Sequence, residues 1–235
     1  MTSEISKIQE LIWLAETNFW IFKRIYDKYY KNAKSHNNPD LLLLIANNSF
    51  EHAILILHSL LVSKDEKELK IEKVLSDVIV HDALNDNGTK LDGLRNAMLA
   101  SYPEHASVTK QLIQNGFNGD DLQELRKMCR KIGPIKLKEI IDKFKNSGFH
   151  KIRHEKVAHK DKKHPDPAGL PRRVFNDQVV KSLEDIVKML VVESYFWFDY
   201  VPYNSDLDRL LPQLDKIFSA FPKKIIGDLT ESYSL

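Results

Sequence analysis

The chain has 235 residues, of which 43% are hydrophobic, enough for the core of one large domain or of a domain with an insertion. A formal net charge of +2 is too small to indicate a polyanion as partner by itself. Cys129 is the single cysteine, which excludes an intrachain disulfide and favours a reducing cytoplasm. The first residues lack the pattern of a signal peptide, and every long apolar run carries charges, so no membrane association is expected.

Two long helices are expected in the first quarter of the chain. From Glu4 to about Ala33, apolar residues recur every three or four positions, which predicts an amphipathic helix. After a break at residues 35–39, a second helix is predicted to about Val62, with Asn38 as its N-cap. A short connection between two long helices implies that they pack as an antiparallel pair.

The middle of the chain, residues 64–132, is predicted to be an elaboration or insertion on the helical bundle. Residues 64–80 show helical spacing, whereas residues 81–106 contain turn-forming residues and are expected to form a loop with short helical pieces. Residues 107–131 are expected to form one or two short helices, interrupted by the two glycines within residues 115–119.

Two more long helices are predicted in the second half. One has Pro134 in its first turn and extends towards Asp161, with a kink or a break at residues 146–148, and the prolines that follow it prevent continuation. The other runs from Asn176 to about Val201 and ends in an aromatic cluster, which is expected in the core or in a dimer interface.

No segment shows the alternation of a strand, and no internal repeat is evident. A last amphipathic segment covers residues 204–221. The sequence therefore predicts an all-α fold, a helical bundle of long antiparallel helices forming a single domain over residues 1–235.

One segment near the middle has the highest density of groups suited to phosphate chemistry. Arginine offers a permanent planar charge that matches phosphate oxygens, and histidine exchanges protons near neutral pH. Between Lys131 and Lys163 there are eleven lysines and arginines against four acidic residues, which is typical of a polyanion-facing patch or of a solvated helix face. Three histidines and an arginine fall within ten positions of this stretch: His150, Arg153, His154 and His159.

Helical spacing separates these four residues. His154 and His159 are five residues apart, about 140° around a helix, whereas a zinc-protease helix needs histidines four apart. His150 and His154 are four apart and could share a metal, but no third and fourth ligand accompany them. Arg153 and His159 lie about 120° apart and can converge on one phosphate across a groove. Glu155, four residues before His159, could hydrogen-bond the imidazole ring.

The residues from Arg153 to Asp161 form the pattern Arg-x2-Lys-x-Ala-His-x-Asp. This pattern resembles the signature of the HEPN superfamily (higher eukaryote and prokaryote nucleotide-binding) and, within it, the abortive-infection U-type branch. The aromatic-rich first helix and the helix around residues 48–61 also resemble that branch. The resemblance implies a HEPN-like helical bundle in which two copies of the motif meet across a homodimer. It also implies a metal-independent endoribonuclease that needs no cofactor.

The resemblance further implies a role for each residue of the motif. His159 would take the proton of a ribose 2′-hydroxyl or protonate the leaving 5′-oxygen, Arg153 would hold the scissile phosphate, and His154 would support the positioning. The products would carry 2′,3′-cyclic phosphate and 5′-hydroxyl ends. Supporting roles are expected for Glu155, Lys156 and Asp161. Attraction of the RNA backbone is expected from Lys151, Lys160, Lys162 and Lys163.

The function expected from this resemblance is that of a cytoplasmic RNA-cleaving toxin or phage-defence effector, with a nucleotidyltransferase-like antitoxin as a candidate partner. The alternative is a non-catalytic HEPN-like module that binds nucleic acid, a nucleotide or a partner protein, because some HEPN-like proteins bind without cleaving. A purely structural role is also open, in which Arg153 pairs with an acidic residue and His159 lies at a helix end.

Overall fold

Helices account for nearly all of the chain that the computed structural model describes, and no strand occurs in that part. The described residues are 2–30, 40–63, 69–78, 88–101, 122–149 and 177–198, together with 200, 212, 213 and 216. For these residues the prediction of an all-α fold is confirmed. None of the helices in these ranges combines the length and the apolar character that a membrane crossing requires.

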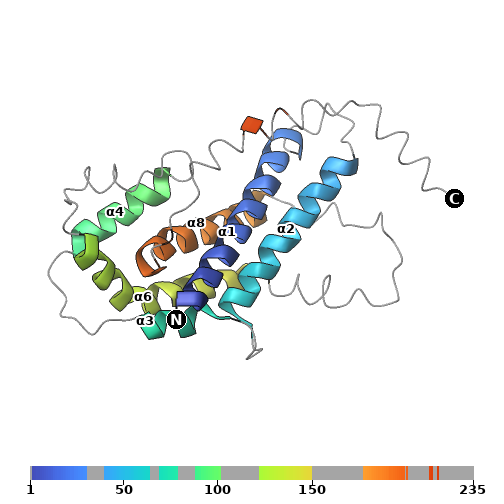
Figure 1. Cartoon of the computed structure of the whole chain (residues 1–235). Coiled ribbons are helices and arrows are strands. Elements are labelled where there is room, and N and C mark those ends of the chain that lie inside the picture. The colour runs from blue at the N-terminus through green and yellow to red at the C-terminus, as the bar shows by residue number, and fades with distance from the viewer. Residues whose placement is uncertain are drawn as a thin grey trace.

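Helices α1 (Thr2–Ile25) and α2 (Asp40–Leu61) pack side by side and run in opposite directions (Figure 1). A π-helical segment, η1 (Tyr26–Tyr30), continues α1. The predicted antiparallel pair is therefore confirmed, although the expected cap at Asn38 lies outside the described residues. Between them the rings of Phe22 and Phe50 lie 4.9 Å apart. Both helices contribute large side chains that are almost fully buried: Ile8, Ile12, Phe19, Phe22, Phe50, Ile54 and Leu57.

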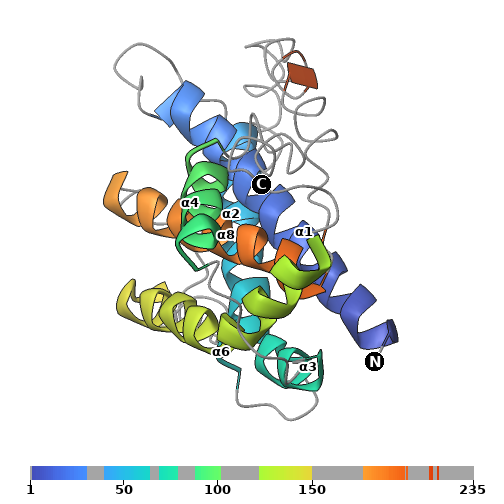
Figure 2. The same ribbon diagram turned by 90° about the vertical axis from the view of Figure 1, so that its left-hand side faces the viewer.

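Helix α8 (Asp177–Phe198) is the element around which the others gather. It packs against α1, α3, α4 and α6, and it lies between α4 and α6 in both views (Figures 1 and 2). Every residue from Leu190 to Phe198 is buried, so this half of the helix is enclosed on all sides. A helix enclosed in this way needs apolar side chains all round, as the sequence provides with only Glu193 and Ser194 as polar exceptions. The aromatic cluster lies in the core, one of its two expected places.

Helix α6 (Leu122–Asn146) corrects the prediction that one helix ends near residue 131 and another starts at Pro134. The helix runs through Pro134 without ending, and it changes direction along its length (Figure 2). Gly133, the residue directly before Pro134, is where two neighbouring helices come close to α6. A Cβ atom there would come within 3.0 Å of both Leu75 Cδ2 and Trp197 Nε1, so glycine allows α3 and α8 to approach closely. Sequence rules treat glycine and proline as helix breakers, whereas here packing on both sides holds the helix together.

The middle of the chain contributes two further helices to the same core. Helix α3 (Ile71–Val78) confirms the helical spacing seen in residues 64–80, and it buries Ile71, Val74 and Leu75. Helix α4 (Gly88–Ser101) is longer than the short pieces expected within residues 81–106. Its buried residues join the main core cluster, as do those of α3. Of the amphipathic segment predicted over residues 204–221, only residues 212, 213 and 216 are described.

Side chains from other helices satisfy the carbonyl groups at the end of α8. Gln9 on α1 donates to the carbonyl oxygen of Phe198 (2.7 Å), and Arg130 on α6 donates to that of Trp197 (2.9 Å). The last carbonyls of a helix have no partner within the helix, so a buried helix end requires donors of this kind. These two bonds join α1 and α6 to α8.

Glu16 on α1 is a carboxyl group within the core. It is fully buried, and Tyr200, just beyond α8, donates a hydrogen bond of 2.6 Å to its Oε2 atom. Burial raises the pKa of Glu16 from 4.5 to about 8, while the hydrogen bond from Tyr200 opposes this shift. Glu16 is therefore largely protonated at neutral pH, and the uncharged form suits its apolar surroundings.

We expect the stability of the fold to fall as the pH rises from about 4.5 to about 8. Over this range the folded protein holds a proton on Glu16 that the unfolded chain has lost, so rising pH favours unfolding, by on the order of 4 kcal/mol in total. Urea unfolding at a series of pH values should show that Glu16→Gln removes most of this decrease, because glutamine stays neutral. The exposed Glu10→Gln is the matched control and should keep the wild-type pH dependence. An unchanged pH dependence in Glu16→Gln would contradict this account.

Candidate functional site

The predicted catalytic and RNA-binding residues lie outside the part of the chain that the structure describes. These residues are Lys151, Arg153, His154, Glu155, Lys156, His159, Lys160, Asp161, Lys162 and Lys163. His150, the other histidine of the segment, also lies outside it. Their roles therefore stay predictions, and the structure instead describes the chain directly before and after them.

The chain enters the motif segment from a fixed point in the core. Helix α6 ends at Asn146, and the Ser147 amide donates to the Lys143 carbonyl (3.0 Å). Gly148 follows with a φ of 78°, a left-handed conformation that glycine adopts without strain and that commonly ends helices. This terminus decides between the kink and the break expected at residues 146–148, because α6 ends there.

Phe149 is the last described residue before the predicted motif at residues 153–161, and its side chain anchors the chain in the core. Its side chain is fully buried, with its ring 5.8 Å from that of Phe144 and 6.3 Å from that of Phe50. Aromatic contacts at these separations add to the stabilisation from burial. The helix end at Gly148 and the buried ring of Phe149 together fix where the motif segment begins.

A small pocket adjoins this point, between the end of α6 and the start of α8. Its volume is about 270 Å³, and it is lined by Lys143, Asn146, Ser147, Gln178, Val179 and Ser182. Among the described residues of this lining, Lys143 alone is charged, and its ammonium group also contacts Asp185 at 3.2 Å. The remaining polar side chains carry amides and hydroxyls, so the lining combines one cation with neutral hydrogen-bonding groups.

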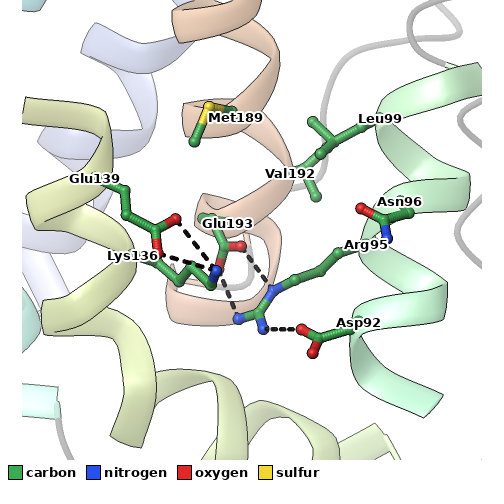
Figure 3. A pocket seen from close by; sticks show the side chains of 9 residues that line it. All are labelled: Asp92, Arg95, Asn96, Leu99, Lys136, Glu139, Met189, Val192 and Glu193. Carbon is green, nitrogen blue, oxygen red and sulfur yellow. Dashed lines mark hydrogen bonds and ion pairs between the residues drawn. The ribbon is translucent and has the colours of Figure 1, made fainter. Parts of the chain in front are cut away.

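A larger pocket of about 380 Å³ lies between α4, α6 and α8 (Figure 3). One end is apolar and carries Leu99, Met189 and Val192, and the other end is charged (Figure 3). The remaining lining residues are Asp92, Arg95, Asn96, Lys136, Glu139 and Glu193. Apolar walls with a few converging polar groups are typical of small-molecule sites.

Arg95 and Glu193 form a buried ion pair at the charged end of this pocket. Arg95 Nη2 donates to Glu193 Oε2 at 2.9 Å, and Arg95 Nε lies 2.7 Å from Oε1, so the guanidinium meets the carboxylate through two nitrogens. Both residues are buried, with relative exposures of 4% and 5%. Burial raises the pKa of Glu193, while the neighbouring charges of Arg95 and Lys136 oppose the shift.

Three further charged groups surround this pair. Asp92 Oδ1 lies 3.6 Å from Arg95 Nη1, and Lys136 Nζ donates to both carboxylate oxygens of Glu139 at 3.2 Å.

Cys129 lies close enough to Arg95 for its charge to act on the thiol. Burial raises the pKa of the Cys129 thiol far above the ordinary range, and the positive charge of Arg95 opposes this shift only in part. Its thiol is thus poorly suited to act as a nucleophile.

Sequence reasoning missed this pocket because its charged residues are spread over the chain. Arg95 and Glu193 are 98 positions apart, and neither belongs to a recognisable motif. The available signal was Glu193 itself, a carboxylate within a strongly apolar helix that requires a buried partner. The sequence offers many arginines and lysines, so it does not identify which of them that partner is.

Comparison with known proteins adds no further identification. No protein-family model matches this chain, and no curated protein or solved structure matches it.

We expect Arg95→Met to lower the free energy of unfolding by about 3–5 kcal/mol, because it leaves the Glu193 carboxylate buried without its cation. Adding Glu193→Leu to the same chain should recover most of this loss, since the second change removes the unpaired charge. Urea unfolding of the single and double variants measures the coupling between the two residues. Lys181→Met, which breaks an exposed pair with Asp185, is the matched control and should change stability by less than about 1 kcal/mol. Equal stability of wild type and Arg95→Met would show that the pair does not stabilise the fold.

Proposed function

We propose that this chain is a metal-independent endoribonuclease of the HEPN type that acts as a toxin or phage-defence effector. The observation that carries the proposal is the pattern Arg-x2-Lys-x-Ala-His-x-Asp at residues 153–161, within a strongly basic stretch. The long antiparallel helices α1 and α2 and the all-helical composition of the described residues are compatible with such a bundle. The lysine, amide and hydroxyl groups that line the pocket beside Phe149 support a polyanionic substrate near the start of the motif.

In the proposed reaction, the ribose 2′-oxygen attacks the adjacent phosphorus and the bond to the 5′-oxygen breaks. His159 accepts the proton of the 2′-hydroxyl or gives a proton to the leaving 5′-oxygen, and histidine suits either task near neutral pH. Arg153 binds the phosphate and stabilises the negative charge that develops on it, while His154 supports the positioning. The products are a 2′,3′-cyclic phosphate and a 5′-hydroxyl end. Atoms and charge balance without a metal or a cofactor.

The proposed active form is a homodimer in which two copies of the motif build one composite site. Two copies would supply two imidazoles, so one could act as base and the other as acid. Glu155, Lys156 and Asp161 support the site, and Lys151, Lys160, Lys162 and Lys163 attract the RNA backbone. A nucleotidyltransferase-like antitoxin is the proposed protein partner.

The purified protein should degrade total RNA in the presence of EDTA and leave 5′-hydroxyl ends that polynucleotide kinase can label directly. Arg153→Ala and His159→Ala should each lower the cleavage rate at least about 100-fold, the usual effect of removing a phosphate-stabilising or proton-transferring group. His52→Ala, which removes an exposed histidine on α2, is the matched control and should retain wild-type activity. Thermal unfolding of each variant checks that the fold is kept.

Two outcomes would contradict this function. Cleavage that survives both Arg153→Ala and His159→Ala would show that the motif is not the active site. RNA binding without new 5′-hydroxyl ends would favour the non-catalytic module, in which the same residues hold a nucleic acid or nucleotide without cutting it.

A further inference from the structure

The pocket between α4, α6 and α8 has chemistry that the proposed ribonuclease function does not use. Its apolar end is formed by Leu99, Met189 and Val192, and its other end gathers charges of both signs (Figure 3). The described residues that line it come from α4, α6 and α8. The arrangement therefore calls for an explanation of its own.

The charged end offers hydrogen-bond donors. Arg95 donates from Nη2 to Glu193, and its Nε atom lies 2.7 Å from Glu193 Oε1 as an ion pair. Its Nη1 atom is buried, lies 3.6 Å from Asp92 Oδ1 and makes no hydrogen bond within the described part of the chain. Because a buried donor without an acceptor is unfavourable, an acceptor from a ligand would be favoured there. Lys136 lies on the facing wall, on α6, and its ammonium group donates to both carboxylate oxygens of Glu139. An ammonium group has three donors, so a ligand oxygen could accept the third hydrogen bond.

The charged end also offers acceptors that face outwards. The side chains of Asp92 and Glu139 are 66% and 48% exposed, and they come from opposite walls of the pocket. Among the described lining residues, the three carboxylates of Asp92, Glu139 and Glu193 outnumber the two cations, Arg95 and Lys136. A phosphate or another dianion would be repelled by these carboxylates. A simple amine would leave Arg95 Nη1 without an acceptor.

We propose that this pocket binds a free α-amino acid with an apolar side chain. The ligand carboxylate would accept from Arg95 Nη1 and Lys136 Nζ, and the ligand ammonium would donate to Asp92 or Glu139. The ligand side chain would lie against Leu99, Met189 and Val192. A zwitterion matches the mixture of charges, because each of its two charged groups finds a partner of opposite sign.

The size of the pocket agrees with this class of ligand. A volume of about 380 Å³ is at the lower end of small-molecule sites, which span roughly 300–1,000 Å³. The pocket is large enough for one free amino acid and too small for a folded peptide. This binding site goes beyond the proposed ribonuclease function and does not depend on it, since the contacts proposed here use only residues outside the motif.

Isothermal titration calorimetry of the full chain with L-leucine, L-methionine and L-valine tests the proposal. At least one of them should bind saturably with one site per chain. Two analogues of leucine separate the charge requirements: 3-methylbutylamine lacks the carboxylate, and 4-methylpentanoate lacks the ammonium group. Each should bind at least about tenfold more weakly than L-leucine if leucine binds, with the corresponding analogues used for another amino acid. An analogue that binds as tightly as its parent amino acid would overturn the assignment of a zwitterion.

Variants locate the binding site without disturbing the buried Arg95–Glu193 pair. Asp92→Asn and Lys136→Gln should each weaken binding about tenfold, because each removes one charged contact at a position that is partly or largely exposed. Asp142→Asn and Lys138→Gln are matched controls on the exposed face of α6, outside the pocket, and should bind as the wild type does. The absence of binding by all three amino acids at millimolar concentration would overturn the proposal, as would wild-type affinity in both pocket variants.

Discussion

The second half of α8 is enclosed on every side, and the positions of the neighbouring helices follow from this enclosure. Nine consecutive buried residues, Leu190 to Phe198, need partners in all directions, and α1, α3, α4 and α6 supply them. Burial of large aromatic and aliphatic side chains is the main favourable term in folding. A helix placed in this way also brings its polar groups into the core, where each requires a partner. Gln9 and Arg130 meet the carbonyls at its end, and Arg95 meets Glu193.

The buried pair of Arg95 and Glu193 links this packing requirement to the candidate binding pocket. A buried ion pair rarely stabilises a fold more than apolar residues of the same shape would, because both charges must lose their hydration. Here the pair holds a guanidinium at the base of a pocket, and two of its nitrogens, Nε and Nη1, make no hydrogen bond among the described residues. Buried charged groups that present a polar atom to a pocket are typical of functional sites. The same pair thus joins α4 to α8 and gives the pocket its polarity.

Helix α6 lines the proposed amino-acid pocket and, at its end, leads towards the segment that carries the proposed ribonuclease motif. That motif, residues 153–161, begins four residues after Phe149, and at Phe149 a buried aromatic ring fixes the chain in the core just after the left-handed Gly148. The amino-acid pocket lies further back along the facing surfaces of α6 and α8. Lys143, which lines the pocket beside Phe149, contacts the sulfur of Met189, which lines the other (3.9 Å). The same two helices therefore line both pockets, and a change in their packing would affect both.

The positions of most helices, and the residues proposed for the chemistry, can be read from the sequence alone. The periodic apolar residues of α1, α2 and α8 mark these helices because burial of one face, or of all faces, must repeat with the helical turn. The motif at residues 153–161 is local, so its residues could be named without any knowledge of packing, whereas their arrangement lies outside the described part of the structure. The course of α6 and the pairing of Arg95 with Glu193 depend instead on how the helices pack together. Helix α6 passes through Gly133 and Pro134 because Leu75 and Trp197 pack against it there, and both contacts come from distant parts of the chain. The partner of Glu193 depends on which cation the fold brings within 3 Å, and a charge in a sequence shows the need for a partner but not its identity.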